Sequence, residues 1–278
     1  YADIKKWAEA LTDKGKGIYG ITLRGKPGWG ENMAYVSTLV NTFGGTWFDM
    51  DWKATIDSPE WKSAISYYVD LMKANGPPGA TSNGFNENLT IFATGKAAMW
   101  IDATSGAGPL FDPKESQVSD KVAFANAPIE KTPNGSHWLW SWAFAIPKSS
   151  KAAEEAKKFA LWATSKEYMK MVADETGWAT VPPGTRKSLY DNPEYQKAAP
   201  FAAVTLKAMQ TADPTNPAIR PVPYTGVQFV GIPEFQSFGT VVGQNVAGAL
   251  AGKMTVDAAL KASQAAANKA VKQAGLQK

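Results

Sequence analysis

The chain has 278 residues, of which 44% are hydrophobic and 12% aromatic, so it is long enough for one large domain or two of ordinary size. The absence of cysteine excludes disulfides, thiol catalysis and thiolate metal sites. A formal net charge of +4 without a basic cluster argues against a nucleic-acid partner. No apolar run reaches the roughly 20 residues that span a bilayer, and Tyr1 in place of methionine indicates a processed or truncated piece.

Apolar spacing at three and four residues predicts a series of helices. Asp3 is a candidate N-cap for the first, and Pro59 in the first turn favours the third. In chain order, the expected helices cover residues 1–15, 31–45, 57–76, 86–96, 151–164, 165–175, a stretch from about 192 broken at Pro200, 235–250 and 255–274.

Between these helices, short apolar runs predict strands over residues 17–23, 97–102, 121–128 and 138–147. A proline-rich connection lies before the last two helices. Alternation of helices and strands predicts an α/β fold.

Several short motifs match known sites only in part. Residues 15–20 carry the glycine spacing of a dinucleotide site but follow a helix, so we expect a helix stop and turn. Residues 49–60 begin like a calcium loop and lack its later ligands and its glycine. His137, the only histidine, has no partner ligand type for zinc, and Ser105 lacks a nucleophile elbow. Paired carboxylates for glycoside hydrolysis remain possible, because they need only spatial closeness.

The 11 tryptophans are the strongest remaining signal. Strand alternation over residues 138–146 places five large side chains on one face: Trp138, Trp140, Trp142, Phe144 and Ile146. We expect Phe144 and Ile146 to lie in the core. For Trp140 and Trp142 the sequence leaves a core position and a ligand-facing position equally open.

Indole faces next to planar polar groups suit sugars and polyols, which offer C–H groups for packing and hydroxyls for hydrogen bonds. Such groups gather at the ends of predicted elements, where sites are usually built. The candidate ligand-binding residues chosen on this ground are Arg24, Trp29, Glu31, Asn32, Trp100, Asp102, Gln228, Glu234 and Gln236.

The ordered set of segments resembles the type 1 extracellular solute-binding proteins of ABC importers, the group that includes maltose-binding protein. The resemblance rests on "YADIKKWAEALTDKGKGIYGI", "FGGTWFD", "FATGKAAMWIDATSGAG", "APIEKTPNG", "WAFAIPKSSKAAEEAKKFALWATSKEYMKMV", "TGWATVPP" and "LAGKMTVDAALKASQAAANKAV". The segments "WLWSW" and "GIPEFQ" look most like members that carry sugar alcohols. Many relatives have glycines where Trp140 and Ser141 stand here.

The resemblance implies a periplasmic binding protein type II fold and a longer protein, whose N-terminal lobe mostly precedes this chain. On this basis residues 1–140 and 190–278 form the C-terminal lobe. Residues 141–189 form a hinge strand and the return to the N-terminal lobe. The ligand is expected between the lobes, which close about the hinge.

The resemblance also implies site residues. Asn32 and the loop before it match a segment facing the cleft, and Arg24 is the candidate hydroxyl donor. Asp102 and Ser105 match a loop where relatives place a polar group and a stacking aromatic. Trp178 is a further candidate, as is the start of the "IPEFQ" helix.

The implied function is non-catalytic capture of a sugar alcohol or small sugar, without a cofactor, and delivery to the membrane permease of an ABC importer. The protein is expected to be monomeric, and periplasmic or, in a Gram-positive bacterium, extracellular on a lipid anchor. Two alternatives stay open: a carbohydrate-active enzyme or lectin-like module, and a globular domain whose tryptophans all lie in the core.

Overall fold

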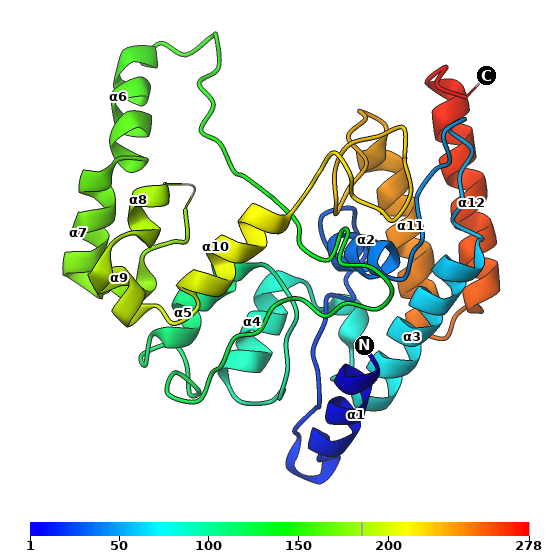
Figure 1. Ribbon diagram of the computed structural model, residues 1–278, viewed down its shortest axis with the longest axis horizontal. Helices are drawn as coiled ribbons and strands as arrows, with labels where there is room; N and C mark the ends of the chain where they lie inside the picture. The colour runs from blue at the N-terminus through cyan, green and yellow to red at the C-terminus, as the bar shows by residue number, and fades with distance from the viewer. Residues whose placement is uncertain (185, 278) are drawn as a thin grey trace. The chain divides into compact units, whose positions relative to one another are not determined.

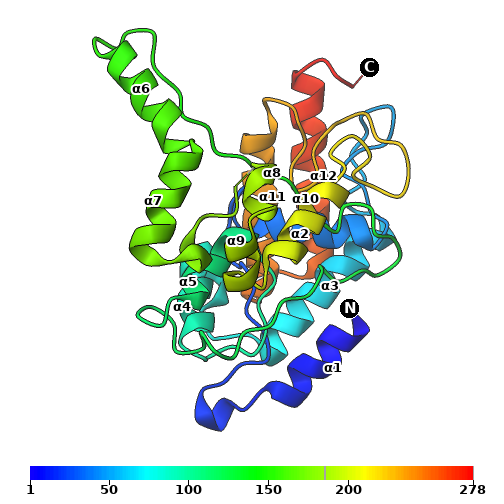
Figure 2. The same cartoon turned by 60° about the vertical axis from the view of Figure 1, so that its left-hand side comes forward.

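The computed structural model describes residues 1–184 and 186–277 (Figures 1 and 2). These residues form two compact units. Unit 1 contains residues 1–103, 125–139 and 208–278, without the undescribed terminal residue, and unit 2 contains residues 104–124 and 140–207. The assignment of residues 1–140, 141–189 and 190–278 to lobes stays a prediction.

Helices make up most of the regular structure of both units. Unit 1 holds α1 (Ala2–Leu11), η1 (Lys14–Lys16), α2 (Asn32–Thr42), α3 (Pro59–Asn75), η2 (Ala80–Ser82), α4 (Phe85–Ala93), α11 (Phe235–Leu250) and α12 (Val256–Gln273). Unit 2 holds η3 (Thr104–Gly106), α5 (Ala107–Phe111), α6 (Ala153–Ala163), α7 (Lys166–Thr176), η4 (Trp178–Thr180), α8 (Lys187–Tyr190) and α9 (Pro193–Ala198), and α10 (Ala202–Thr211) crosses the boundary. Within the described part of the chain, no helix combines the length and the hydropathy that crossing a membrane requires.

The predicted helices are confirmed, with small changes at their ends. Thr255 caps α12 through its side chain, as Ser58 caps α3. The expected N-cap of α1 is wrong: Tyr1 occupies that position, and Asp3 lies in the first turn. The glycine-rich stretch after α1 is a stop and turn, because Gly17 ends η1 with a φ of 69°.

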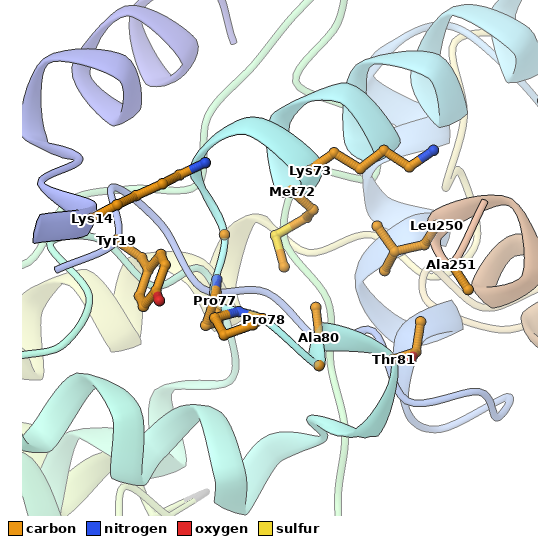
Figure 3. Close-up of a pocket in the computed structure, with 12 residues that line it drawn as sticks. Lys14, Tyr19, Met72, Lys73, Pro77, Pro78, Ala80, Thr81, Leu250 and Ala251 are labelled. Carbon is orange, nitrogen blue, oxygen red and sulfur yellow. The ribbon is translucent and has the colours of Figure 1, made fainter. Parts of the chain in front are cut away.

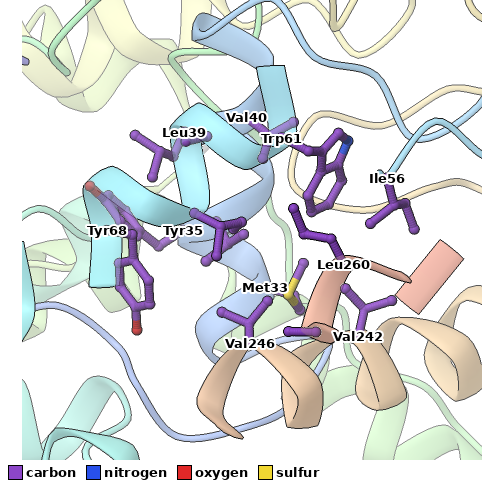
Figure 4. Packing of buried hydrophobic residues seen from close by; sticks show 14 of the residues in the cluster. Met33, Tyr35, Leu39, Val40, Ile56, Trp61, Tyr68, Val242, Val246 and Leu260 are labelled. Carbon is purple, nitrogen blue, oxygen red and sulfur yellow. The ribbon is translucent and has the colours of Figure 1, made fainter. Parts of the chain in front are cut away.

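The core of unit 1 lies where α2, α3, α11 and α12 meet (Figure 4). Trp61, Ile65, Tyr68 and Met72 of α3 all point into it and are buried, as their helical spacing predicts. The five-residue connection between α11 and α12 makes them a helical hairpin, visible in Figure 1. This layer of helices supports the loops that carry the candidate site.

The four expected strands are not continuous strands in the structure. Residues 17–23 and 97–102 do run side by side in parallel, but only through the isolated bridges Tyr19–Ala97 and Thr22–Trp100. The two bridged residues of the first segment are three apart, whereas a regular ladder repeats every two residues. The ladder is interrupted because the N–H groups of the intervening Gly20 and Ile21 donate to Thr12 Oγ1 and Asn75 O and not to the neighbouring segment.

The tryptophan-rich segment, residues 138–147, also forms no strand. The expectation that Phe144 and Ile146 lie in the core is wrong for this structure, since they are 61% and 38% exposed. Their alternating pattern is that of a strand with one buried face, but the described part of unit 2 covers this face only in part, through the edge-on contact of Phe159 with Phe144 at 6.0 Å.

Unit 2 has a small aromatic core of its own. Phe111, Phe124 and Phe201 lie within 5.6 Å of one another by ring centroids, and Tyr195 contacts Phe201. In contrast, α6 has no buried residue. In this unit, residues 104–124 therefore pack against Phe201, which also contacts Tyr195, and the 140–171 stretch is left largely exposed.

Candidate functional site

A buried ion pair between Arg24 and Asp102 forms the centre of the candidate site in unit 1. Arg24 Nε and Nη2 donate to the two oxygens of Asp102 at 2.8 and 2.5 Å. Arg24 Nη1 donates to Gly30 O at 2.8 Å, which fixes the guanidinium in a third direction. Burial lowers the pKa of Arg24, the hydrogen bond and charge of Asp102 raise it, and the net shift is upward. The guanidinium is therefore charged and held in one orientation.

Asp102 is fully occupied by protein donors. Besides the two bonds from Arg24, its carboxylate accepts from Trp100 Nε1 at 3.2 Å and from the N–H of Ala103 at 2.6 Å. A carboxylate offers about four acceptor positions, and four donors fill them. The geometry thus gives Asp102 the task of orienting Arg24 and Trp100.

Two aromatic rings lie against the Arg24 guanidinium. Its carbon is 5.2 Å from the centroid of Phe85 and 5.7 Å from that of Trp138, within the range of cation–π attraction. Phe85 in turn contacts Trp100 at 5.5 Å. Our sequence-based selection of site residues omitted Phe85 and Trp138. The alternation of residues 138–146 places Trp138 on the face of large side chains and so points to it as a candidate. No sequence motif points to Phe85, because only the fold brings α4 to Arg24.

Glu31 lies on the other side of Arg24. Its Oε2 is 3.9 Å from Arg24 Nη1 and its Oε1 is 3.4 Å from Lys26 Nζ. Oε2 is buried and has no hydrogen-bond partner among the described residues. A Cβ at Gly84 would stand 2.5 Å from this oxygen, so a larger residue where α4 begins would displace the Glu31 carboxylate.

Asn32 holds the loop of residues 24–31 in place. Its side chain is fully buried, accepts from the N–H of Gly28 at 3.1 Å and donates to Gly243 O on α11 at 2.8 Å. Trp29, in the same loop, packs edge-on against Phe235 at 6.4 Å. Asn32 therefore positions the loop from within the core and does not face a cleft.

The three candidates around α11 differ in accessibility. Gln228 is 4% exposed, and its Nε2 donates to Leu139 O at 2.7 Å, next to Trp138. Its Oε1 is buried and has no hydrogen-bond partner among the described residues. Glu234 is half-buried at the N-cap of α11, and Gln236 is exposed in the first turn.

The other four candidates, Trp140, Trp142, Ser105 and Trp178, belong to unit 2. Trp140 and Trp142 are 47% and 88% exposed and contact each other edge-on at 5.5 Å. Ser105 is exposed in η3, and Trp178 is half-buried in η4.

The described residues, 1–184 and 186–277, contain no group of three histidine or acidic side chains placed to bind a metal ion. The segment that begins like a calcium loop forms a turn in which Asp49 accepts from the N–H groups of Asp51 and Lys53. His137 is also engaged: its Nε2 accepts from the N–H of Ala127, and its Nδ1 bonds to Thr211 Oγ1.

Comparison with known proteins identifies relatives. The family model of the bacterial extracellular solute-binding protein matches residues 1–170. The mannitol-binding protein of Pseudomonas aeruginosa is 50% identical over 278 residues, which are 100% of this chain and 64% of that protein. A solved ABC transporter solute-binding protein from Agrobacterium vitis S4, with bound D-mannitol, is 58% identical with a TM-score of 0.96, over 99% of this chain and 66% of that one.

A more distant solved structure has a similar fold. The ABC transporter solute-binding protein from Agrobacterium radiobacter K84, in complex with ribitol, is 27% identical with a TM-score of 0.76, over 96% of this chain and 63% of that one. These likenesses confirm the predicted α/β solute-binding-protein fold. The chain spans slightly less than two thirds of the length of each of these relatives.

Proposed function

The chain belongs to the bacterial extracellular solute-binding protein family, and on this premise we propose that it captures a sugar alcohol without catalysis. One observation carries the proposal: a fixed guanidinium between aromatic faces, in a chain 58% identical to a protein solved with D-mannitol. Mannitol or a closely related polyol is the proposed ligand.

The geometry of Arg24 suits a polyol. Arginine has five N–H donors, and the bonds to Asp102 and Gly30 use three of them. Two donors in a rigid fork remain for neighbouring hydroxyl groups, while the half-buried rings of Trp138, Trp100 and Phe85 offer faces for C–H groups. Because Asp102 is saturated, it acts by holding Arg24 in place.

We further propose the two-lobe organisation that the sequence predicts, with residues 1–140 and 190–278 in one lobe and 141–189 returning to the other. Its support is a run of exposed aromatic side chains in unit 2, Phe144, Phe159 and Trp162, whose rings contact one another in series at 6.0 Å and which are 61%, 56% and 43% exposed. A contiguous apolar surface of this kind marks an interface. The proposed cover is the segment that corresponds to the third of the relatives this chain does not span.

The proposed partner is the membrane permease of an ABC importer, to which a monomeric protein delivers its ligand. The family description is extracellular, and we propose the periplasm, or the outer face of a Gram-positive membrane on a lipid anchor. Trp140 and Trp142 are proposed to contact the ligand from the hinge, with Trp29, Glu31, Gln228, Glu234, Gln236, Ser105 and Trp178 as further candidates.

Tryptophan fluorescence of the full-length protein, titrated with mannitol, sorbitol, arabitol, xylitol, glucose and maltose, tests the proposal. We expect a saturable change with mannitol or with one or two polyols. Arg24→Gln and Trp138→Ala should abolish it, whereas Trp7→Phe, an exposed tryptophan on α1, should leave it intact. If calorimetry and fluorescence both show no saturable binding of any polyol or sugar, the proposed function is wrong.

A further inference from the structure

Unit 1 has a groove that the Arg24 site does not use. Two adjoining cavities of about 350 and 550 Å³ form it, and they share Tyr19, Pro77 and Pro78. The first cavity is walled by η1, Tyr19, the C-terminal end of α3, residues 77–81 and the end of α11 (Figure 3), and the second by residues 16–19, Pro77, Pro78 and the end of α4 with the residues up to Lys96. The groove is therefore built from several separate segments of one compact unit.

The groove combines an apolar floor with a cationic rim. Met72, Pro77 and Leu250 face the hollow in Figure 3. Lys14 and Lys73 line the first cavity, Lys16 and Lys96 line the second, and no acidic residue lines either. All four lysines are exposed, and within the described residues only Lys16 has an ion pair, with Asp13 at 2.9 Å.

Local structure accounts for part of this positive charge. Lys73 lies in the last turn of α3, where a cation is favoured by the helix dipole. Lys14 and Lys16 lie in the last turn of η1, where Lys16 pairs with Asp13, and Lys96 follows the C-cap of α4 by two residues. Lys14, Lys73 and Lys96, which have no ion pair among the described residues, leave positive charge beside the apolar floor, and this complements a segment that carries acidic residues next to an apolar anchor.

The wall of the groove contacts the loop that carries Arg24. A Cβ at Gly25 would stand 2.3 Å from Ala80 O and 3.1 Å from Leu250 Cδ2, so this backbone lies directly against two lining residues. The N–H groups of Gly25 and Lys26 both donate to Asn83 O, at 2.9 and 3.0 Å. The short stretch of residues 24–26 thus lies between the two sites: Arg24 belongs to the ligand site, and Gly25 packs against residues that line the groove.

We propose that this groove is a docking surface for an extracytoplasmic segment of the importer's membrane subunit, with acidic residues flanking an apolar anchor. The inference rests on the proposed function and adds the place where the partner binds. A partner that contacts Ala80 and Leu250 would touch the residues that pack against Gly25, next to Arg24.

The test uses the full-length protein and the purified permease complex in lipid vesicles. The variant K14E/K73E/K96E should bind the permease at least about tenfold more weakly and lose the salt dependence of that binding, because rim charges guide association. Its affinity for the polyol should stay within about twofold of the wild-type value, since none of the three touches the Arg24 site. The matched control is K261E/K269E/K272E on α12, which reverses three exposed lysines and includes one in a last turn.

The outcomes separate the two proposals. Wild-type permease binding by K14E/K73E/K96E, or an equal loss in the α12 control, would overturn the docking surface and leave polyol capture intact. If the wild-type protein binds no polyol but binds the permease in a lysine-dependent way, the proposed function is wrong and the docking surface stands. A synthetic peptide of the acidic loop should compete with the permease, whereas free phosphate and a second copy of the protein should not.

Discussion

Replacing Asp102 by asparagine should be among the most damaging single substitutions in unit 1. The side chains of Arg24 and Asp102 are 10% and 3% exposed, so the pair is shielded from solvent. Asparagine keeps the shape but removes the charge and one acceptor group, leaving a charged guanidinium buried without its partner. Loss of one member of a buried pair costs about 3–5 kcal/mol of unfolding free energy.

The measurement is urea unfolding followed by tryptophan fluorescence and circular dichroism. The control is Asp257→Asn, which breaks the ion pair with Lys62 at 2.8 Å, where the side chains are 57% and 67% exposed. That exposed pair should contribute about 0–1 kcal/mol. The double variant Arg24→Met/Asp102→Leu should recover part of the loss, because it removes both buried charges. If Asp102→Asn costs no more than Asp257→Asn, the reasoning about the buried pair is refuted.

Further predictions concern close contacts, capping, titration and exposure. Gly20→Ala should lower the unfolding free energy in urea by about 1–3 kcal/mol, because the added Cβ would stand 2.0 Å from Ala8 O. The control Gly30→Ala should be nearly neutral in the same titration, because its Cβ would meet no atom within 4 Å. Thr255→Ala removes the N-cap hydrogen bond from the N–H of Ala258 at 3.1 Å and should lower the unfolding free energy by about 1 kcal/mol in thermal unfolding. Thr255→Ser keeps a hydroxyl at this position and should retain most of that stability. Hydrogen bonds from Thr215 and Asn216 lower the pKa of Asp213 from 3.8 to about 2, so its stabilising contribution is present above pH 4 and lost as the pH falls toward 2. Thr215→Val should move that pKa back toward 3.8 in a carboxyl NMR titration, and an unchanged pKa would contradict the assigned cause. Trp142→Phe should reduce the iodide-quenchable fluorescence of this chain, because Trp142 is 88% exposed; Trp61→Phe, at 0%, should not.

Helices were predictable from the sequence because their signals are local. Ser58, Pro59 and the apolar spacing of Trp61, Ile65 and Tyr68 specify α3 within one stretch of chain, and the structure follows them. The family and the fold were also recognisable from ordered segments alone. Strands were less predictable, because pairing depends on partners distant in sequence, and Gly20 and Ile21 donate to Thr12 and Asn75 instead.

The sequence by itself determined which chemical groups are available: Arg24, Asp102, Trp100 and the alternating tryptophans, with no thiol and one histidine. Only the tertiary structure decided their tasks. It joined Arg24 to Asp102 across 78 positions, brought Phe85 and Trp138 to the guanidinium, and buried Asn32 in the core. The physical reason is that hydrogen-bond capacity and burial are properties of neighbours in space, and a residue pattern records only neighbours along the chain.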